Sequence, residues 1–235
     1  MFHVKICGVT TADDARMVCD AGADAIGLNF VDGSPRRLDL DAARAVAGAV
    51  PRGVVRVGVF AGVAAAEILR VARAVGLDAV QLHGHFDGAS GPVDPPCLCG
   101  ELRGLPVIRA VRLGSGHESD RLAVARRWIE EAAKAGGAPA MVIVDAAVSH
   151  GTAAGGLGGT GALVDWTALA RSGSLQVPMG LAGGLTPDNV AEAIRVTGLR
   201  AVDTASGVES GPGRKDPAKV RAFVAAARRA LGLAR

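Results

Sequence analysis

Short apolar segments alternate along this chain with longer segments whose apolar residues recur at helical spacing. The apolar segments are rich in Val and Ile, which is typical of strands buried on both faces of a parallel sheet. The pattern predicts eight strands, at His3–Cys7, Ala25–Phe30, Val54–Phe60, Ala79–His83, Val107–Val111, Ala140–Asp145, Val177–Ala182 and Arg200–Asp203.

The intervening segments predict helices with recognisable start and stop signals. Thr11 is a candidate N-cap, Gly76 is a candidate C-cap, and Pro187 after Thr186 marks a helix start. The segment after the fourth strand is rich in Pro and Gly and leaves room only for a short helix. The predicted helices are Thr11–Ala21, Leu40–Val50, Ala64–Val75, Cys97–Leu102, His117–Ala135, Leu163–Ser172, Thr186–Thr197 and Asp216–Leu231.

Strict alternation of strand and helix predicts a parallel sheet. The 235 residues give about 29 residues to each of eight strand–helix units, close to the minimum for a closed barrel. No linker-like segment interrupts the pattern. We therefore expect a single-domain (β/α)8 TIM barrel over residues 1–235.

Composition and charge narrow the classes of partner. Hydrophobic residues make up 49% of the chain and aromatic residues 3%, so a large core is available but few rings could stack on bases. The net charge of +3 comes without a dense basic block, and neither a signal peptide nor a membrane-spanning segment is visible. The four cysteines lack the spacing of disulfide frameworks or zinc sites. We expect a cytoplasmic protein with reduced thiols and no metal, which binds neither nucleic acid nor a membrane.

In such a barrel the functional groups follow the carboxyl ends of the strands. Cys7 ends the first predicted strand, and alternation places Lys5 and Cys7 on the same, interior face. A lone cysteine is usually a small buried hydrophobe, but a nearby ammonium stabilises a thiolate, which can accept a proton. Cys7 is therefore a candidate catalytic base.

Two carboxylates also end predicted strands. Asp145 follows an apolar run and is either a loop cap or a catalytic acid or base, and a buried carboxyl can donate a proton at neutral pH. Asp203 ends the eighth strand, next to the first in a closed barrel, which predicts a structural ion pair with Lys5. Cys7 and Asp145 then stand well apart around the ring, as two groups acting on opposite sides of a substrate would.

Two further side chains follow strand ends. Arg36 could bind a substrate carboxylate with both of its terminal nitrogens, or it could be a surface arginine like Arg37. His83 could face the pocket or make a hydrogen bond in the rim.

Glycine is concentrated in the last three strand–helix loops. Glycines beside a helix N-terminus let several backbone N–H groups converge on an anion, and barrels usually bind phosphate with the loops after strands seven and eight. The alternative is that these glycines only form tight turns. The sequence favours a phosphate site made of Gly183, Gly184, Ser206 and Gly207, closed from the side by Gly159.

Seven sequence blocks occur in a fixed order: Lys5-Ile6-Cys7-Gly8, Ser34-Pro35-Arg36, Val57-Gly58-Val59-Phe60, Gln81-Leu82-His83-Gly84, Gly158-Gly159-Thr160-Gly161, Leu181-Ala182-Gly183-Gly184-Leu185 and Ser206-Gly207-Val208-Glu209. Together they resemble the phosphoribosylanthranilate isomerase family of tryptophan biosynthesis. Each block alone is a weak signal, whereas the ordered set covers nearly the whole chain.

The resemblance implies a cofactor-free Amadori rearrangement of N-(5-phosphoribosyl)anthranilate to 1-(2-carboxyphenylamino)-1-deoxyribulose 5-phosphate. It implies that Cys7 is the general base and Asp145 the general acid, while Arg36 holds the anthranilate carboxylate and the glycine loops with Ser206 hold the phosphate. His83 joins the substrate-binding set. The only expected partner is this small phosphosugar, and the expected assembly is a monomer or a homodimer.

Some features depart from the family pattern or leave alternatives open. The long loop at 146–157 is either a lid or a spacer. With so few aromatic residues, the anthranilate ring would lie against aliphatic walls, with Phe30, Phe60 and Phe86 as the aromatic candidates. Rival functions are another phosphosugar enzyme, such as an indoleglycerol-phosphate synthase or an aminoaldose isomerase of the histidine pathway, and a non-catalytic phosphate-binding barrel. The histidine-pathway enzyme would be expected to carry a carboxylate where Cys7 stands.

Overall fold

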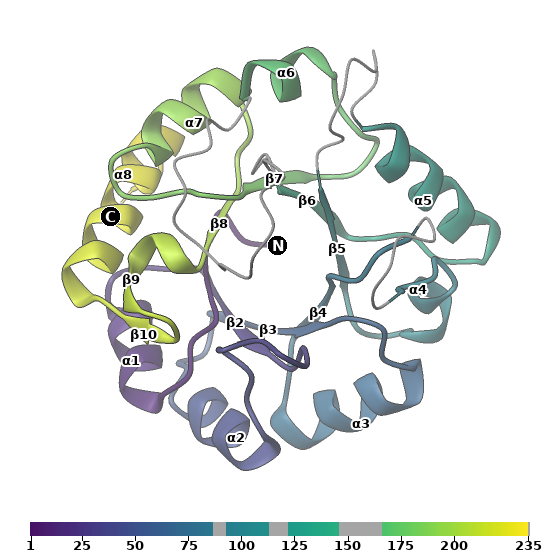
Figure 1. Cartoon of the computed structure of the whole chain (residues 1–235), viewed down its shortest axis with the longest axis horizontal. Helices are drawn as coiled ribbons and strands as arrows, with labels where there is room; N and C mark the ends of the chain where they lie inside the picture. Colours follow the sequence, from purple (N-terminus) through teal and green to yellow (C-terminus); the bar gives the residue numbers. More distant parts are fainter. Residues whose placement is uncertain (87–92, 113–121, 146–165, 235) are drawn as a thin grey trace.

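The computed structural model describes residues 1–86, 93–112, 122–145 and 166–234. Eight parallel strands pair in sequence order, and β1 also pairs with β8, which closes the sheet into the barrel seen in Figure 1. The strands are β1 Val4–Cys7, β2 Ala25–Asn29, β3 Val55–Phe60, β4 Ala79–Leu82, β5 Val107–Arg112, β6 Met141–Asp145, β7 Met179–Ala182 and β8 Val202–Thr204. The predicted (β/α)8 barrel is confirmed, and every predicted strand is present with small changes at its ends.

Helices surround the barrel on its outer side (Figure 1). They are α1 Ala12–Asp20, α2 Leu40–Gly48, α3 Ala65–Val75, α4 Leu98–Glu101, α5 Ala123–Lys134, α6 Trp166–Arg171, α7 Val190–Thr197 and α8 Pro217–Leu231. The segment between β8 and α8 adds a single 3-10 turn, η1 Ser206–Val208, and a small hairpin of β9 Glu209–Gly211 and β10 Arg214–Lys215, which lies beside α1 in Figure 1. No helix in the described ranges is long and apolar enough to cross a membrane.

Most helix ends follow from local side-chain chemistry. Thr11 caps α1 by accepting a hydrogen bond from the Asp14 N–H at 3.1 Å, and Asp216 caps α8 through the N–H groups of Ala218 and Lys219. Gly76 ends α3 in the left-handed conformation, at φ 75°. The Pro-rich segment after β4 supports only the single turn of α4, as predicted.

The predicted start of α7 is wrong. The segment from Thr186 to Asn189 forms a turn, and the helix begins only at Val190. Asn189 accounts for the delay, because its side chain accepts from the Thr186 N–H at 2.8 Å and donates to the Gly184 carbonyl at 3.0 Å. These bonds tie the helix entrance to the loop after β7. The predicted starts of α5 and α6, His117 and Leu163, lie outside the described ranges.

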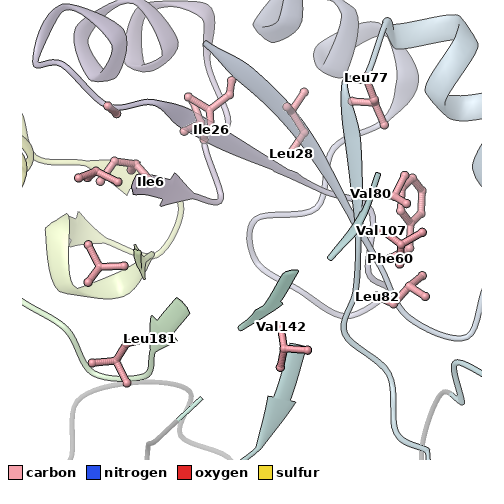
Figure 2. Packing of buried hydrophobic residues seen from close by; sticks show 14 of the residues in the cluster. Ile6, Ile26, Leu28, Phe60, Leu77, Val80, Leu82, Val107, Val142 and Leu181 are labelled. Atoms are coloured by element: carbon pink, nitrogen blue, oxygen red, sulfur yellow. The ribbon is translucent and has the colours of Figure 1, made fainter. Parts of the chain in front are cut away.

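The strands separate two apolar layers. Outward-facing residues such as Ile26, Leu28 and Leu82 pack against the helices, and Figure 2 shows Phe60, Val80, Leu82 and Val107 gathered on one side of their strands. The alternate positions point into the barrel and form a smaller cluster made of Phe2, Ala25, Val57, Ala79, Ile108, Met141, Ile143 and Ala201. The interior is therefore filled by apolar side chains, and polar interior groups lie next to them along the strands.

This alternation corrects one expectation about aromatic residues. Phe60 belongs to the outer layer and is 1% exposed, and the Phe30 ring stacks on it at 5.0 Å between centroids. A ring in that layer cannot meet a ligand at the barrel mouth, so Phe60 is not a substrate contact and Phe30 is engaged with it. Phe86 is partly buried, with the Arg127 guanidinium over its ring at 4.8 Å.

Candidate active site

Lys5 and Asp203 form a buried ion pair between the neighbouring strands β1 and β8. The two residues are register partners, and Lys5 Nζ lies 2.9 Å from Asp203 Oδ2. Burial lowers the pKa of the Lys5 ammonium, but Asp203 and Cys7 outweigh that effect and leave the pKa raised. The predicted ion pair is confirmed, and Lys5 is positively charged inside the barrel.

Cys7, the last residue of β1, is partly buried and lies on the Lys5 side of the strand, because the alternate residues Val4 and Ile6 belong to the outer layer. Its register partner on β2 is Gly27, where a β-carbon would stand only 2.5 Å from the Cys7 sulfur. The glycine therefore provides the space that the thiol occupies.

Three cationic side chains surround Cys7. Lys5 comes from its own strand, Arg36 from the loop after β2, and Lys215 from β10, and each interacts electrostatically with the Cys7 sulfur. Burial lowers the pKa of Lys215 even though Glu209 and Cys7 oppose that change. Segments from both ends of the chain thus place positively charged side chains near one thiol.

Arg36 is held by Glu209, which follows β8. Arg36 Nε and Nη2 lie 2.8 and 2.6 Å from the two carboxylate oxygens of Glu209, and the Arg36 side chain is only 17% exposed. Arg37, in contrast, is 56% exposed and pairs with Asp32. Arg36 is therefore an inward, fixed guanidinium at the mouth of the barrel, and the alternative of a solvated surface arginine is wrong.

His83 directly follows β4, and Asp145 is the last residue of β6. The His83 side chain is exposed, yet enough protein surrounds it that loss of hydration lowers its pKa, with charges of Asp145, Lys5, Arg112 and Asp203 also acting on it. Asp145 is partly buried and is the register partner of Arg112 on β5. The charges that act on His83 come from β1, β5, β6 and β8, so residues of these strands lie with His83 at one end of the barrel.

The glycine-rich loops after β7 and β8 pack on each other. Gly183 and Gly184 adopt φ values of 92° and 63°, which favour glycine. A β-carbon on Gly207 would lie 1.8 Å from the Leu185 carbonyl oxygen, and Thr204 Oγ1 donates to the same oxygen at 2.7 Å. Ser206 begins the 3-10 turn η1 directly beside this contact. The four predicted phosphate-loop residues are brought together; Gly159 and the segment 146–157 lie outside the described residues.

Two clusters of interacting side chains were not predicted. One is the pairing of Glu209 with Arg36 and Lys215, for which the only sequence signal was the acidic residue that closes the Ser206–Glu209 block. The other is Asp94, which is fully buried and accepts from the N–H groups of Gly62 and Gly84 in the loops after β3 and β4.

Arg109 and Trp128 complete the Asp94 neighbourhood. Arg109 donates to the Gly84 carbonyl at 2.8 Å and lies 5.2 Å from the Trp128 ring centroid, while Trp128 Nε1 donates to the Asp94 carbonyl at 3.1 Å. This buried network fixes the backbone next to His83. No sequence spacing connects its members, because they come from three separate segments.

The other thiols differ from Cys7 in their surroundings. All four cysteines are free. Burial raises the pKa of Cys19 and of Cys99 to about 11, so both remain protonated at neutral pH, and Cys97 is exposed. Across the described ranges, no group of three or more His, Cys, Asp or Glu side chains has the arrangement of a metal site.

The fold and the site together define a (β/α)8 barrel of the enzyme type. Polar side chains of β1, β4, β6 and β8 and two glycine-rich loops meet at the carboxyl end of its strands, where such barrels carry their active sites. The chain belongs to the N-(5'-phosphoribosyl)anthranilate (PRA) isomerase family, whose model matches residues 4–226.

Individual relatives agree with this assignment. The chain is 44% identical over 226 residues to the N-(5'-phosphoribosyl)anthranilate isomerase of Myxococcus xanthus (strain DK1622), covering 96% of both chains. It is similar to the crystal structure of phosphoribosyl anthranilate isomerase from Thermotoga maritima, with 34% identity, a TM-score of 0.75 and coverage of 99% of this chain and 100% of that one. A phosphoribosyl anthranilate isomerase in complex with reduced 1-(o-carboxyphenylamino)-1-deoxyribulose 5-phosphate is 32% identical, with a TM-score of 0.73 and coverage of 99% and 100%.

Proposed function

We propose that this protein isomerises N-(5-phosphoribosyl)anthranilate to 1-(2-carboxyphenylamino)-1-deoxyribulose 5-phosphate in tryptophan biosynthesis. The observation that carries the proposal is the position of Cys7 and Asp145 at the carboxyl ends of β1 and β6 of one closed barrel. The assigned family and the similarity to a structure that contains the reduced product support the same reaction.

In the proposed mechanism Asp145 is the general acid. Its carboxyl group donates a proton to the ring oxygen of the ribose as the bond between that oxygen and C1′ breaks. The anilino nitrogen supplies the electron pair, so an open-chain Schiff base forms. General acid catalysis by a positioned carboxyl group contributes about 10²- to 10⁴-fold to such a step.

Cys7 then acts as the general base. Its thiolate removes the proton from C2′ of the Schiff base, the electrons move to the anilino nitrogen, and an enolamine forms. Tautomerisation of the enolamine gives the ketone. The rearrangement moves protons within one molecule and needs no electron acceptor, so we expect no cofactor. Lys5, Arg36 and Lys215 stabilise the negative charge that the thiol carries before the transfer.

Both anionic ends of the substrate have candidate binding groups. The backbone N–H groups of Gly183, Gly184 and Gly207, with Ser206, would bind the phosphate, and Gly159 would close that site. Arg36 would bind the anthranilate carboxylate, and His83 would contact the substrate between its two anionic ends. Fixing both ends places the reacting carbons between acid and base, and orientation of this kind can contribute several kcal/mol.

The proposal also covers the working form of the protein. We propose one domain over residues 1–235 that acts in the cytoplasm as a monomer or a homodimer. A similar structure is described as monomers generated from a dimeric phosphoribosylanthranilate isomerase of Thermotoga maritima, so both states are named for that relative. Light scattering on the purified protein distinguishes the two states.

An enzyme assay tests the proposed function. The unstable substrate is generated in the cuvette by condensing anthranilate with ribose 5-phosphate, which releases water and needs no metal ion, and its loss of fluorescence is followed. Wild type should turn over after exhaustive chelation, while Cys7→Ala and Asp145→Asn should lose at least about 100-fold in kcat and still bind the reduced product. Cys97→Ser, which changes an exposed thiol, is the matched control.

The same assay separates the rival functions. A non-catalytic phosphate-binding barrel would bind the reduced product without turning over the substrate. Full activity of Cys7→Ala would overturn the mechanism. Turnover of a histidine-pathway aminoaldose with a higher kcat/KM than that for N-(5-phosphoribosyl)anthranilate would favour the histidine-pathway isomerase instead. Against that function, Cys7 stands where such an enzyme is expected to carry a carboxylate.

A further inference from the structure

Glu209 is a buried carboxylate at the edge of the proposed site. Its side chain is 4% exposed, and it lies at the start of β9, in the segment that follows β8 and η1. One oxygen accepts from Arg36 Nε at 2.8 Å and from Lys215 Nζ at 2.7 Å, and the other accepts from Arg36 Nη2 at 2.6 Å. The backbone oxygen of Glu209 accepts from Lys219 Nζ at 2.8 Å.

The geometry of this pair leaves one edge of Arg36 available. A guanidinium carries five N–H groups in a planar fork, and Glu209 uses the edge formed by Nε and Nη2. Within the described residues, Nη1 of Arg36 has no hydrogen-bond partner. The edge formed by Nη1 and the second N–H of Nη2 can therefore still bind a carboxylate with two parallel hydrogen bonds.

The aliphatic part of Arg36 is also confined. A β-carbon on Gly8, which has φ +68°, would lie 2.3 Å from Arg36 Cδ, so the arginine passes directly over the residue that follows Cys7. The Arg36 backbone N–H donates to Ser34 Oγ at 3.2 Å, and the same hydroxyl accepts from Asn29 Nδ2 at 3.1 Å. The stem of Arg36 is thereby fixed close to the thiol, and Glu209 fixes its head.

Charge supports the same arrangement. Burial raises the pKa of the Glu209 carboxyl, but the hydrogen bonds from Arg36 and Lys215 outweigh that effect and leave the pKa lowered. Glu209 is therefore ionised at neutral pH and balances one of two neighbouring cations. The unpaired Nη1 edge of the guanidinium directs the positive charge of Arg36 toward an anionic ligand.

From these contacts we propose that Glu209 is a positioning residue for Arg36, which it orients so that the Nη1 edge receives the aromatic carboxylate of the substrate. The inference rests on the proposed function, because it assigns the carboxylate contact to Arg36. Glu209 itself touches no substrate in this arrangement. Its effect on carboxylate binding passes through the guanidinium, whereas its hydrogen bond with Lys215 bears on the charge around Cys7.

The test is a double-mutant cycle on Arg36 and Glu209. Glu209→Gln keeps the shape but removes the charge, and it should raise KM and weaken binding of the reduced product by roughly 10- to 100-fold. The kcat at saturation should change much less, because the acid and the base stay in place. Arg36→Ala should raise KM at least as much, and adding Glu209→Gln to Arg36→Ala should cause no further increase.

Two readouts separate positioning from a general structural effect. Binding of inorganic phosphate should stay within about twofold of wild type in Glu209→Gln, since the phosphate loops do not depend on Arg36. Glu209→Asp keeps the charge on a shorter stem, so its KM should lie between those of wild type and Glu209→Gln. Glu67→Gln is the matched control, because Glu67 makes the same two-oxygen contact with Arg70 on the exposed surface of α3.

Each outcome decides the inference. Independent, additive effects of the two substitutions on KM would overturn it, as would an unchanged KM in Glu209→Gln while Arg36→Ala raises KM. An unchanged KM in Arg36→Ala would instead remove the carboxylate contact from the proposed function, and the inference with it. If Glu209→Gln does not fold, the Glu209→Asp protein decides, and a KM equal to that of wild type overturns the inference.

Discussion

Gly27 lies opposite Cys7 in the β1–β2 pairing, and a β-carbon on Gly27 would stand 2.5 Å from the Cys7 sulfur. No real β-carbon tolerates that distance, so any side chain at Gly27 must push the thiol away from its present position. The glycine on β2 therefore determines where the base on β1 can be.

Gly27→Ala tests this relationship. We expect the thiol to move and kcat to fall by roughly 10- to 100-fold, because misplacement of a reacting group by about 1 Å can cost that much. The binding of inorganic phosphate should not change. Steady-state kinetics and a phosphate titration measure the two effects.

Gly48→Ala is the control for the Gly27 substitution. Gly48 lies at the end of α2, and an added β-carbon there would meet no atom within 4 Å. The alanine should leave kcat unchanged and stabilise the helix by up to about 1 kcal/mol. Equal kinetics for Gly27→Ala and wild type would show that the thiol is free to occupy another productive position.

Much of the barrel could be predicted because its strands are buried on both faces. Such strands are uninterrupted apolar segments, and the alternation within them also predicts that Lys5 and Cys7 point inward. The same alternation along β3 places Phe60 in the outer layer, because Val57, three positions earlier, points into the barrel. The face of the strand, and not the scarcity of aromatic residues, decides which rings can reach a ligand.

The pairings within the site could not be predicted, for a physical reason. Arg36 and Glu209 are 173 positions apart, and their contact depends on how the hairpin of β9 and β10 folds back toward the loop after β2. Lys5 and Asp203 were an easier case, because the closure of any barrel makes the first and last strands neighbours. Ion pairs that follow from topology are predictable from sequence, whereas those set by loop conformation are not.

Lys5 and Asp203 should stabilise the fold only while both are present. Lys5→Met leaves the Asp203 carboxylate buried without its cation, and Asp203→Asn leaves the ammonium without its anion. Removing one partner of such a pair costs about 3–5 kcal/mol. We expect each single variant to lose that much free energy of unfolding in urea titrations, and the double variant Lys5→Met with Asp203→Asn to lose less than the sum. Strict additivity would show that the two side chains do not depend on each other.

Gly207 should control the packing of the two glycine-rich loops. An alanine there would place its β-carbon 1.8 Å from the Leu185 carbonyl oxygen, so the loops after β7 and β8 must separate. We expect Gly207→Ala to weaken binding of inorganic phosphate by about tenfold or more and to cost roughly 1–3 kcal/mol of stability. In Gly211→Ala, an added β-carbon meets no atom within 4 Å, so both quantities should match wild type. Calorimetric titration with phosphate distinguishes the two variants.

His83 should report on the charge of Asp145. Loss of hydration lowers the pKa of His83 below its usual 6.5, and the Asp145 carboxylate acts in the opposite direction. The imidazole is therefore neutral at pH 7, and Asp145→Asn should lower its pKa further. An NMR titration of the His83 ring protons in both proteins measures this. A pKa that does not move in Asp145→Asn would mean that Asp145 is already uncharged in the wild type or that the two groups are screened from each other.

Lowering the pH should lower the free energy of unfolding, partly through protonation of Glu209. Its folded-state pKa lies below the unfolded value of 4.5, so the folded state binds its proton less readily than the unfolded state does. The stabilisation is therefore fully present above pH 4.5 and is lost as the pH falls through the folded-state pKa. We expect the free energy of unfolding, measured by urea titration at successive pH values, to fall in wild type below pH 4.5.

Glu209→Gln should start about 3 kcal/mol lower at neutral pH, because Arg36 and Lys215 lose their shared anion, and it should fall less steeply in acid. Glu67→Gln, which alters an exposed pair on α3, should follow the wild-type curve closely. Parallel curves for wild type and Glu209→Gln in acid would mean that the carboxylate is not stabilised by folding, and the role of Glu209 in holding Arg36 would lose its electrostatic basis.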